Sequence, residues 1–253
     1  MVYSGKIYET DGANPVAVHE ADEVRPLAPI PQPPSLRIFR TDCQVDPLEG
    51  LEEDPRFFYG NPASMVGSGL IIPYPEFAVE IGVVPCLGAI LLADAFRIDL
   101  NDADDLILGY TIVNFVVAKD VERAERRSGS GFGRSNDIAA AIGPVITTPE
   151  ELEDELAMTG RGRHYQLTTI LRVNGVEVGR GNTDDLPFTF AQAIQAASQS
   201  CPLRAGDVFA LGPIADLEED GLTIGPEDQV QIAVEKLGTL SLILSPRSEL
   251  IYE

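Results

Sequence analysis

Tryptophan is absent from the sequence, and histidine and cysteine are scarce. The two histidines, His19 and His164, are too few for a histidine-rich metal site and argue against a Ser/His/Asp triad. The three cysteines, Cys43, Cys86 and Cys201, form no CxxC pair that would indicate a metal or redox site. An odd number of widely spaced cysteines fits a reducing compartment.

Basic residues are also few, with 18 Lys and Arg against 40 Asp and Glu and a formal charge of -22. This charge repels phosphate backbones and anionic headgroups, so neither nucleic acid nor a membrane is an expected partner. No apolar run approaches the roughly 20 residues that a membrane span requires, and the N-terminus lacks a signal-peptide pattern. We therefore expect a cytoplasmic protein whose spread of acidic residues keeps its surface soluble.

Proline marks the best candidate for a domain boundary. Five prolines lie between Pro26 and Pro34, where they exclude a helix or a central strand and predict an extended connector laid against the body. Before it, a short apolar-polar alternation interrupted at Asp11-Gly12 predicts a small hairpin. We expect this hairpin and connector over residues 1–37 and one main domain over residues 38–253.

Strand patterns dominate the rest of the chain. PEFAVEIGVVP, residues 75–85, alternates as a two-faced strand, GYTIVNFVVAKD, residues 109–120, reads as a buried strand, and residues 70–72 read as a short strand. Asn174-Gly175 predicts a hairpin turn, and a second hairpin is centred on Leu237-Gly238. The expected fold class is mainly β with short helices, in the α+β sense.

The predicted helices are short. NDADDLILGY should form one that ends at Gly109, and TFAQAIQAASQS should form another that faces the core. TTPEELEDEL opens a third, with Thr148 as N-cap, Pro149 at the first helical position and Glu151 completing a capping box. ERAERRSGSGFGRSND, residues 122–137, is polar and rich in Gly and Ser, which predicts a mobile loop that could serve as a lid.

Several blocks occur in a distinctive order, among them PPSLRIF, FFYGNPASMVG, PEFAVEIGVV, GYTIVNFVVAKD and the VNG hairpin. This order resembles that of the fumarylacetoacetate hydrolase superfamily from Pro26 to the C-terminus. The resemblance implies a mixed β-sheet roll that is usually a homodimer, with the active site at the mouth of the roll.

The resemblance also shows where this chain departs from the metal-dependent members. In those members a metal-ligating Asp follows the PPSLR arginine, and here the residue is Ile38. Their catalytic His follows a Gln, and here Val45 follows Gln44. Their Glu-x-Glu metal ligands match Ala78 and Glu80, or an alternative register places Glu76 at one of the two glutamates.

The last ligand in those members is the Asp of an ND pair, and Phe115 stands there after a retained Asn114. Further on, Val117 occupies a Ser position and Lys119 an Arg position. The family Lys that orients the substrate carbonyl corresponds to Arg134. The Asp that follows it in the family corresponds to Asp137.

These differences predict a site without a catalytic metal or other cofactor, because one carboxylate cannot hold Mg²⁺ or Mn²⁺ at ordinary concentrations. They also make the cavity floor apolar, which favours a larger hydrophobic ligand over a small dicarboxylate. The expected catalytic residues are Glu80, Lys119 and Arg134. The expected substrate-binding residues are Ile38, Gln44, Val45, Ala78, Asn114, Phe115, Val117 and Asp137.

Glu80 has two competing interpretations. In an apolar pocket its pKa would be raised by desolvation, which would make it a general acid or base near neutral pH. Alternatively, it forms an ion pair with Arg134 or Lys119. Asp42 and Cys43 lie where the family carries its His and could reach the pocket, although Cys43 also fits as a small buried filler.

Three functions remain open from the sequence. The first is a metal-independent isomerase, cyclase or C–C lyase for a hydrophobic oxo or 1,3-dicarbonyl compound, suited to a biosynthetic tailoring step. The second is the usual metal-assisted chemistry of 2-oxo acids: hydrolysis, hydration, decarboxylation or tautomerisation. The third is a catalytically silent binding protein that keeps the fold and the dimer interface.

Overall fold

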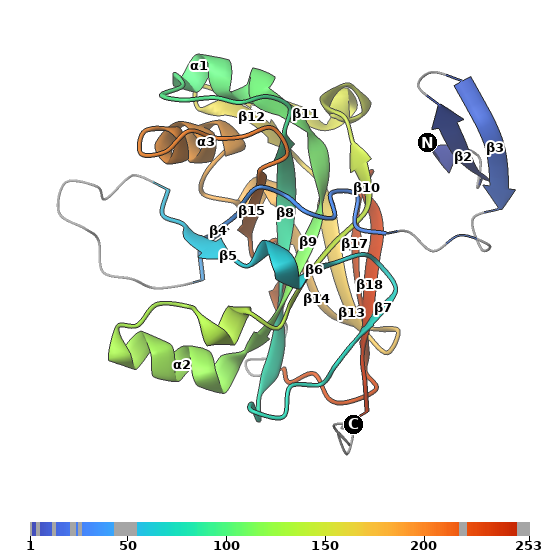
Figure 1. Cartoon of the computed structure of the whole chain (residues 1–253), viewed down its shortest axis with the longest axis vertical. Coiled ribbons are helices and arrows are strands. Elements are labelled where there is room, and N and C mark those ends of the chain that lie inside the picture. The colour runs from blue at the N-terminus through green and yellow to red at the C-terminus, as the bar shows by residue number, and fades with distance from the viewer. Residues whose placement is uncertain are drawn as a thin grey trace.

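The computed structural model describes residues 2–3, 6–11, 14–20, 24, 27–42, 55–217 and 222–246. Within them the chain forms four β-sheets and only short helices, as Figure 1 shows. The two large sheets curl into a mixed half-barrel, and the fold class predicted from the sequence is confirmed.

The larger sheet has seven strands and mixes parallel and antiparallel pairs. In order they are β5 (Phe58–Gly60), β4 (Leu36–Arg40), β15 (Val208–Gly212), β8 (Ile81–Leu91), β9 (Ile107–Ala118), β10 (Ala139–Thr147) and β6 (Met65–Val66). The long antiparallel pair β8 and β9 forms its centre, and both strands are buried almost throughout.

The second sheet has six strands, and a hydrophobic core formed by both sheets lies between them. Its order is β16 (Asp216–Leu217), β14 (Val176–Asn182), β13 (Thr168–Val173), β17 (Gln229–Val234), β18 (Gly238–Leu244) and β7 (Leu70–Ile72). The hairpins predicted at Asn174-Gly175 and around Leu237-Gly238 are both confirmed, as is the short strand at residues 70–72.

Two small sheets complete the β structure. The N-terminal sheet has β1 (Val2–Tyr3), β2 (Lys6–Asp11) and β3 (Asn14–Glu20), and the other has β11 (Leu156–Thr159) and β12 (Gly162–Tyr165). The pairing of β2 with β3 confirms the predicted hairpin near Asp11.

The helices are α1 (Leu100–Ala103), α2 (Lys119–Ser128) and α3 (Phe190–Ser198). The 3-10 helices are η1 (Pro62–Ser64), η2 (Asp104–Leu106), η3 (Arg134–Asn136), η4 (Pro149–Glu155) and η5 (Thr183–Asp185). The capping box of Thr148 and Glu151 is confirmed, although the helix that it opens, η4, is of the 3-10 type. The predicted first helix ends earlier than expected, since Gly109 already lies in β9.

The strand predicted over residues 75–85 is displaced. It begins at Ile81 and continues through Pro85 to Leu91, while Phe77 and Val79 are exposed on the segment before it. Both faces of β8 are covered, so its buried residues form a continuous apolar run rather than an alternation. The prediction therefore placed the two ends of this strand wrongly, although Ile81 and Val83 do share one face.

The loop predicted over residues 122–137 is helical in its first half. Glu122 and Arg126 form an ion pair four residues apart on α2, and Gly129 ends the helix in the left-handed conformation. Glu, Arg and Ala favour a helix, so the composition of residues 122–127 differs from that of the glycine-rich stretch after them.

The proline-rich connector lies against the seven-stranded sheet, as predicted. Ala28 and Ile30 pack on its apolar surface, and Pro29 lies beside Gly143 of β10. The connector ends at Ser35, since Leu36 already belongs to β4. No helix in the described part of the chain is long and apolar enough to cross a membrane.

Candidate functional site

One face of the seven-stranded sheet carries a continuous apolar surface that the second sheet does not touch. All its members belong to the seven strands and are at most 9% exposed. We call this surface the outer apolar face. Its members are Leu36, Ile38, Met65, Val84, Cys86, Ile90, Val113, Phe115, Val117, Ala140, Ile142, Val208 and Ala210.

Three of the expected substrate-binding residues, Ile38, Phe115 and Val117, lie together on this outer apolar face. Phe115 and Val117 share a face of β9 because side chains alternate along a strand. Asn114 points the other way, toward the core between the sheets, where both its polar side-chain atoms lack partners among the described residues.

The pairing of β8 with β9 identifies the positions that face Phe115. Val84 is its direct partner, and Cys86 is the next residue on the same face. Glu80 lies just before β8, and its backbone carbonyl oxygen accepts a hydrogen bond from Lys119 N–H. Lys119 is four residues beyond Phe115, so Glu80 lies about 13 Å from Phe115 along the strand direction.

Residues that bind one ion must bring their oxygens within about 2.6 Å of it, so positions 78 and 80 cannot share a metal with position 115. Ala78 and Glu80, which the resemblance matches to the Glu-x-Glu pair, therefore do not lie beside Phe115 in this structure, and Val84 and Cys86 lie there instead.

The outer apolar face does not fit the divalent metal that the family resemblance implies. The side chains that form this face, which include Ile38 and Phe115 at positions that the resemblance matches to metal ligands, offer no oxygen. In the ranges that the structure describes, no three His, Cys, Asp or Glu residues gather in a way that could hold a metal ion.

A charged cluster adjoins one end of the outer apolar face. Arg40 follows Leu36 and Ile38 on the same face of β4 and donates from Nη1 to Oε2 of Glu122 over 2.8 Å. Arg126 donates to the other oxygen of Glu122 over 2.6 Å, and Arg40 also binds Asp42. The Arg40 and Glu122 side chains are 1% and 6% exposed, so this cluster ties α2 to the end of β4.

The cluster is positively charged around Asp42. Burial raises the pKa of the Asp42 carboxyl, but Arg40, Lys119 and Arg126 outweigh this effect and hold the pKa below its usual value. Lys119 extends its side chain along Gly82 of β8, the glycine that faces Val117. Asp42 is therefore ionised at neutral pH, and the cationic side chains approach the apolar face.

An aromatic pair lies above the same end of the face. Phe58 of β5 packs on the outer apolar face beside Ile38, and its ring centroid is 5.0 Å from that of Phe132. The guanidinium carbons of Arg40 and Arg126 lie 5.9 Å and 5.2 Å from the Phe132 ring centroid. Sequence reasoning missed Phe58, Phe132, Arg40 and Glu122, because only their contacts across the fold distinguish them.

Glu80 does not have the environment expected for a general acid or base. Its side chain is 44% exposed and accepts a hydrogen bond of 2.7 Å from Arg123, rather than from Arg134 or Lys119. This hydrogen bond lowers the pKa of Glu80 below its usual value, which agrees with the ion-pair interpretation, although the partner is Arg123, and not with the raised pKa.

We expect NMR titration of the Glu80 side-chain carboxyl to give a midpoint below that of an unpaired glutamate. Because the folded pKa is lowered, the pair with Arg123 is fully formed at neutral pH and is lost only as the pH falls through that pKa. Arg123→Gln should move the midpoint back toward the usual value. A midpoint near pH 6 to 7 in the native protein would restore the general acid-base role.

The other expected residues are dispersed. The guanidinium of Arg134 lies on the surface 4.4 Å from the Phe77 ring centroid, and Asp137 accepts a hydrogen bond from Asn61. Ala78 is buried in the core between the sheets. Gln44 and Val45, with Cys43, lie outside the described residues.

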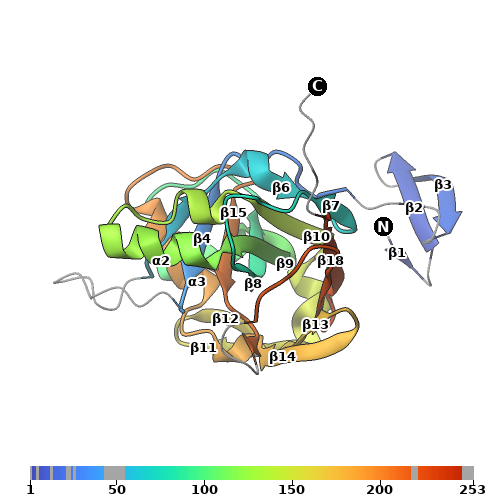
Figure 2. The ribbon, with the colours of Figure 1, turned by 90° about the horizontal axis from the view of Figure 1, so that it is seen from below.

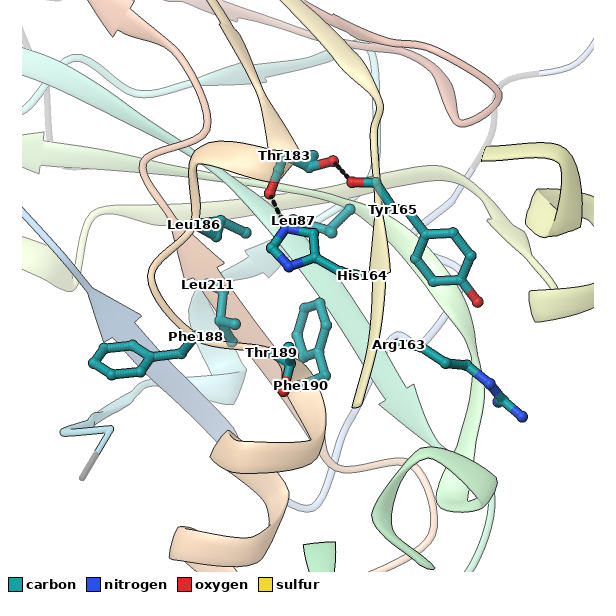
Figure 3. A pocket seen from close by; sticks show the side chains of 10 residues that line it. All are labelled: Leu87, Arg163, His164, Tyr165, Thr183, Leu186, Phe188, Thr189, Phe190 and Leu211. Carbon is teal, nitrogen blue, oxygen red and sulfur yellow. Dashed lines mark hydrogen bonds between the residues drawn. The ribbon is translucent and has the colours of Figure 1, made fainter. Parts of the chain in front are cut away.

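A separate small hollow lies on the opposite side of the sheet, beside α3 (Figure 3). Its apolar walls include Leu87, Leu211 and Phe190, and His164 donates from Nε2 to the Thr183 carbonyl oxygen over 2.9 Å. None of the residues expected from the sequence lines it. It is therefore distinct from the outer apolar face and its charged cluster.

The fold and the sequence together define the class of protein. Residues 39–242 match the family described as fumarylacetoacetate (FAA) hydrolase C-terminal, and the chain belongs to that family. It is 26% identical to the oxaloacetate tautomerase YisK of Bacillus subtilis over 235 residues, which cover 88% of this chain and 74% of that protein. An oxaloacetate tautomerase of Xenopus laevis, fahd2, is 25% identical over 221 residues, covering 85% of this chain and 66% of that one.

Solved structures share the fold. A 5-carboxymethyl-2-hydroxymuconate delta-isomerase from Mycobacterium smegmatis has a TM-score of 0.73 at 23% identity, with 92% of this chain and 86% of that chain covered. A 2-hydroxyhepta-2,4-diene-1,7-dioate isomerase from Mycobacterium marinum has a TM-score of 0.72 at 22% identity, covering 93% and 84%. At these identities the likeness concerns the fold alone.

Proposed function

We propose that this chain is a metal-independent enzyme of the FAA hydrolase family that acts on an apolar oxo or 1,3-dicarbonyl compound through its enol or enolate. The observation that carries the proposal is the outer apolar face, which contains Ile38 and Phe115, two residues that the resemblance matches to metal ligands. A face of this kind favours an apolar substrate body over a small dicarboxylate.

The charge distribution supports the same proposal. Residues 119–134 hold five basic and three acidic side chains, in a chain whose formal charge is -22. Cations next to an apolar surface stabilise an enolate more than they would in water, because little solvent screens them. We assign this role to Lys119 and Arg126, and the ionised Asp42 beside them is our candidate for the proton acceptor.

The first test measures deuterium exchange at the acidic carbon of 1-phenylbutane-1,3-dione, in buffer with EDTA. We expect the protein to accelerate exchange and Lys119→Met to slow it about 100-fold, the usual effect of losing one oxyanion-stabilising group. Lys119→Arg is the matched control, since it keeps the positive charge. Equal rates for Lys119→Met and the native protein would remove Lys119 from the chemistry.

The same samples test the metal. Elemental mass spectrometry after purification in Mg²⁺ and Mn²⁺ is expected to find no stoichiometric metal. Stoichiometric metal, together with EDTA-sensitive tautomerisation of oxaloacetate, would instead assign this chain the reaction named for its Bacillus and Xenopus relatives.

A silent binding protein is the second candidate, and the dense packing of the outer apolar face favours it. Its members are almost fully buried, so a ligand could enter only if a covering segment moved. Binding of the diketone without any acceleration of exchange would support this candidate.

A further inference from the structure

The segment after α2 places one aromatic residue among glycines. Residues 129–133 read Gly-Ser-Gly-Phe-Gly, and Gly129 and Gly131 have φ angles of +70° and +77°. Nothing lies within 4 Å of where a Cβ would stand on either glycine. Phe132 is thus the only apolar side chain among residues 129–133, and the loop is held at its two ends, by Ser130 N–H donating to the Glu125 carbonyl oxygen and by Arg134 N–H donating to the Glu125 carboxylate.

The Phe132 ring contacts Phe58, one of the partly buried side chains that pack against the outer apolar face. Phe58 pairs through β5 with Ile38 on that face. Figure 1 shows the loop and α2 at the end of the sheet close to β4 and β5, and Figure 2 shows the same side from below.

Glu122 holds both cations that contact this ring. Its two carboxylate oxygens accept from Arg40 and Arg126, and each guanidinium then lies within 6 Å of the Phe132 ring centroid. Interactions of this kind favour one ring position when the charges are themselves fixed. Arg40 is fixed to β4 and Arg126 to α2, so Glu122 joins the loop's helix to the sheet.

We propose that Phe132, which backs Phe58 at one end of the outer apolar face, is a door and that Glu122 is its latch, so that a ligand reaches the face when the loop moves away and releases Phe58. The inference deepens the proposed function, because that face is the proposed binding surface. The door would admit an apolar molecule with a carbonyl or carboxylate group. This group would meet Arg40 and Arg126, the two arginines that donate to Glu122, as the molecule enters.

Cys86 provides a reporter beneath the door. Its thiol is fully buried on the outer apolar face and lies next to Gly212, the residue that pairs with Arg40 on β4. Arg40 is therefore about 10 Å from Cys86 across two strand spacings. With Cys43 and Cys201 replaced by Ser, Cys86 is the single thiol, and its alkylation by iodoacetamide measures how often the face is uncovered.

We expect Phe132→Ala to raise the Cys86 alkylation rate about tenfold or more, because the door contacts are lost. Glu122→Gln should raise it by a smaller factor, and Phe132→Leu, which keeps an apolar side chain but has no ring for Arg40 and Arg126 to contact, should also fall between the native protein and Phe132→Ala. Phe96→Ala is the matched control: Phe96 is exposed and has Arg97 5.0 Å from its ring centroid, so this variant loses a similar contact elsewhere.

Urea unfolding of each variant separates local from global opening. The proposal would be overturned if the Cys86 alkylation rate in Phe132→Ala rose only as much as the loss of global stability explains. It would also be overturned if the rate rose equally in Phe96→Ala. Alkylation needs neither substrate nor metal, so failure of the door and failure of the proposed chemistry give different results: the first leaves Cys86 protected in Phe132→Ala, and the second leaves diketone exchange unaccelerated.

Discussion

Arg37→Ala is expected to lower the free energy of unfolding by about 3 to 5 kcal/mol, measured by urea denaturation. Arg37 donates to Asp207 over 2.9 Å, and the two side chains are 3% and 1% exposed. Removing the guanidinium would leave the Asp207 charge buried, with Ser35 as its remaining side-chain donor.

Aromatic packing adds to this loss. The guanidinium carbon of Arg37 lies between 5.4 Å and 6.0 Å from the ring centroids of Phe57, Tyr59 and Phe209. Arg37→Lys keeps the charge but loses the planar stacking, so it should fall between the native protein and Arg37→Ala.

The exposed pair of Arg180 and Glu177 provides the control for this prediction. Its hydrogen bond is just as short, 2.8 Å, but the Arg180 side chain is 55% exposed. Arg180→Ala should therefore change stability very little, because exposed ion pairs are screened. Equal losses in Arg37→Ala and Arg180→Ala would mean that burial does not set the strength of the Arg37 pair.

Phe115→Asp is expected to destabilise the protein more than Phe115→Ala, which should itself cost about 3 to 5 kcal/mol. Phe115 is 1% exposed and faces Val84 and Cys86, so the introduced carboxylate would be ionised in an apolar environment. Its folded pKa would therefore rise above that of the unfolded chain.

The sign of the pH dependence follows. Phe115→Asp loses more free energy of unfolding than Phe115→Ala, and this difference is fully present above the raised pKa of the folded state. It disappears as the pH falls toward the pKa of an unfolded aspartate. Urea denaturation of both variants between pH 5 and 8 measures the difference. Adding Mg²⁺ should not rescue Phe115→Asp, and an excess that does not change with pH would contradict an apolar environment for this position.

Local signals in the sequence predicted local structure well. The Asn174-Gly175 pair, with its two positive φ angles, and the Thr148 and Glu151 capping box each depend on residues close in sequence, and both are confirmed. The order of motifs also predicted the family, since that order survives the exchange of individual side chains.

The site was harder to predict because it depends on strand register. A shift in the start of β8 changes which residues face β9, and the alternation of Phe77 and Val79 belongs to an exposed segment rather than to the strand. Glu122 and Phe132 were assigned to a mobile loop, since nothing in their neighbourhood shows that they meet Arg40 and Phe58.

The proline-rich connector also limits how this protein can be shortened. Ala28 and Ile30 cover part of the outer apolar face, and Pro33 is buried. A form shortened to begin at Leu36 would retain every strand of the large sheet. It would, however, expose the apolar side chains that the connector covers, and we expect it to aggregate during expression. For anyone trimming the chain, the connector is therefore part of what keeps the large sheet soluble.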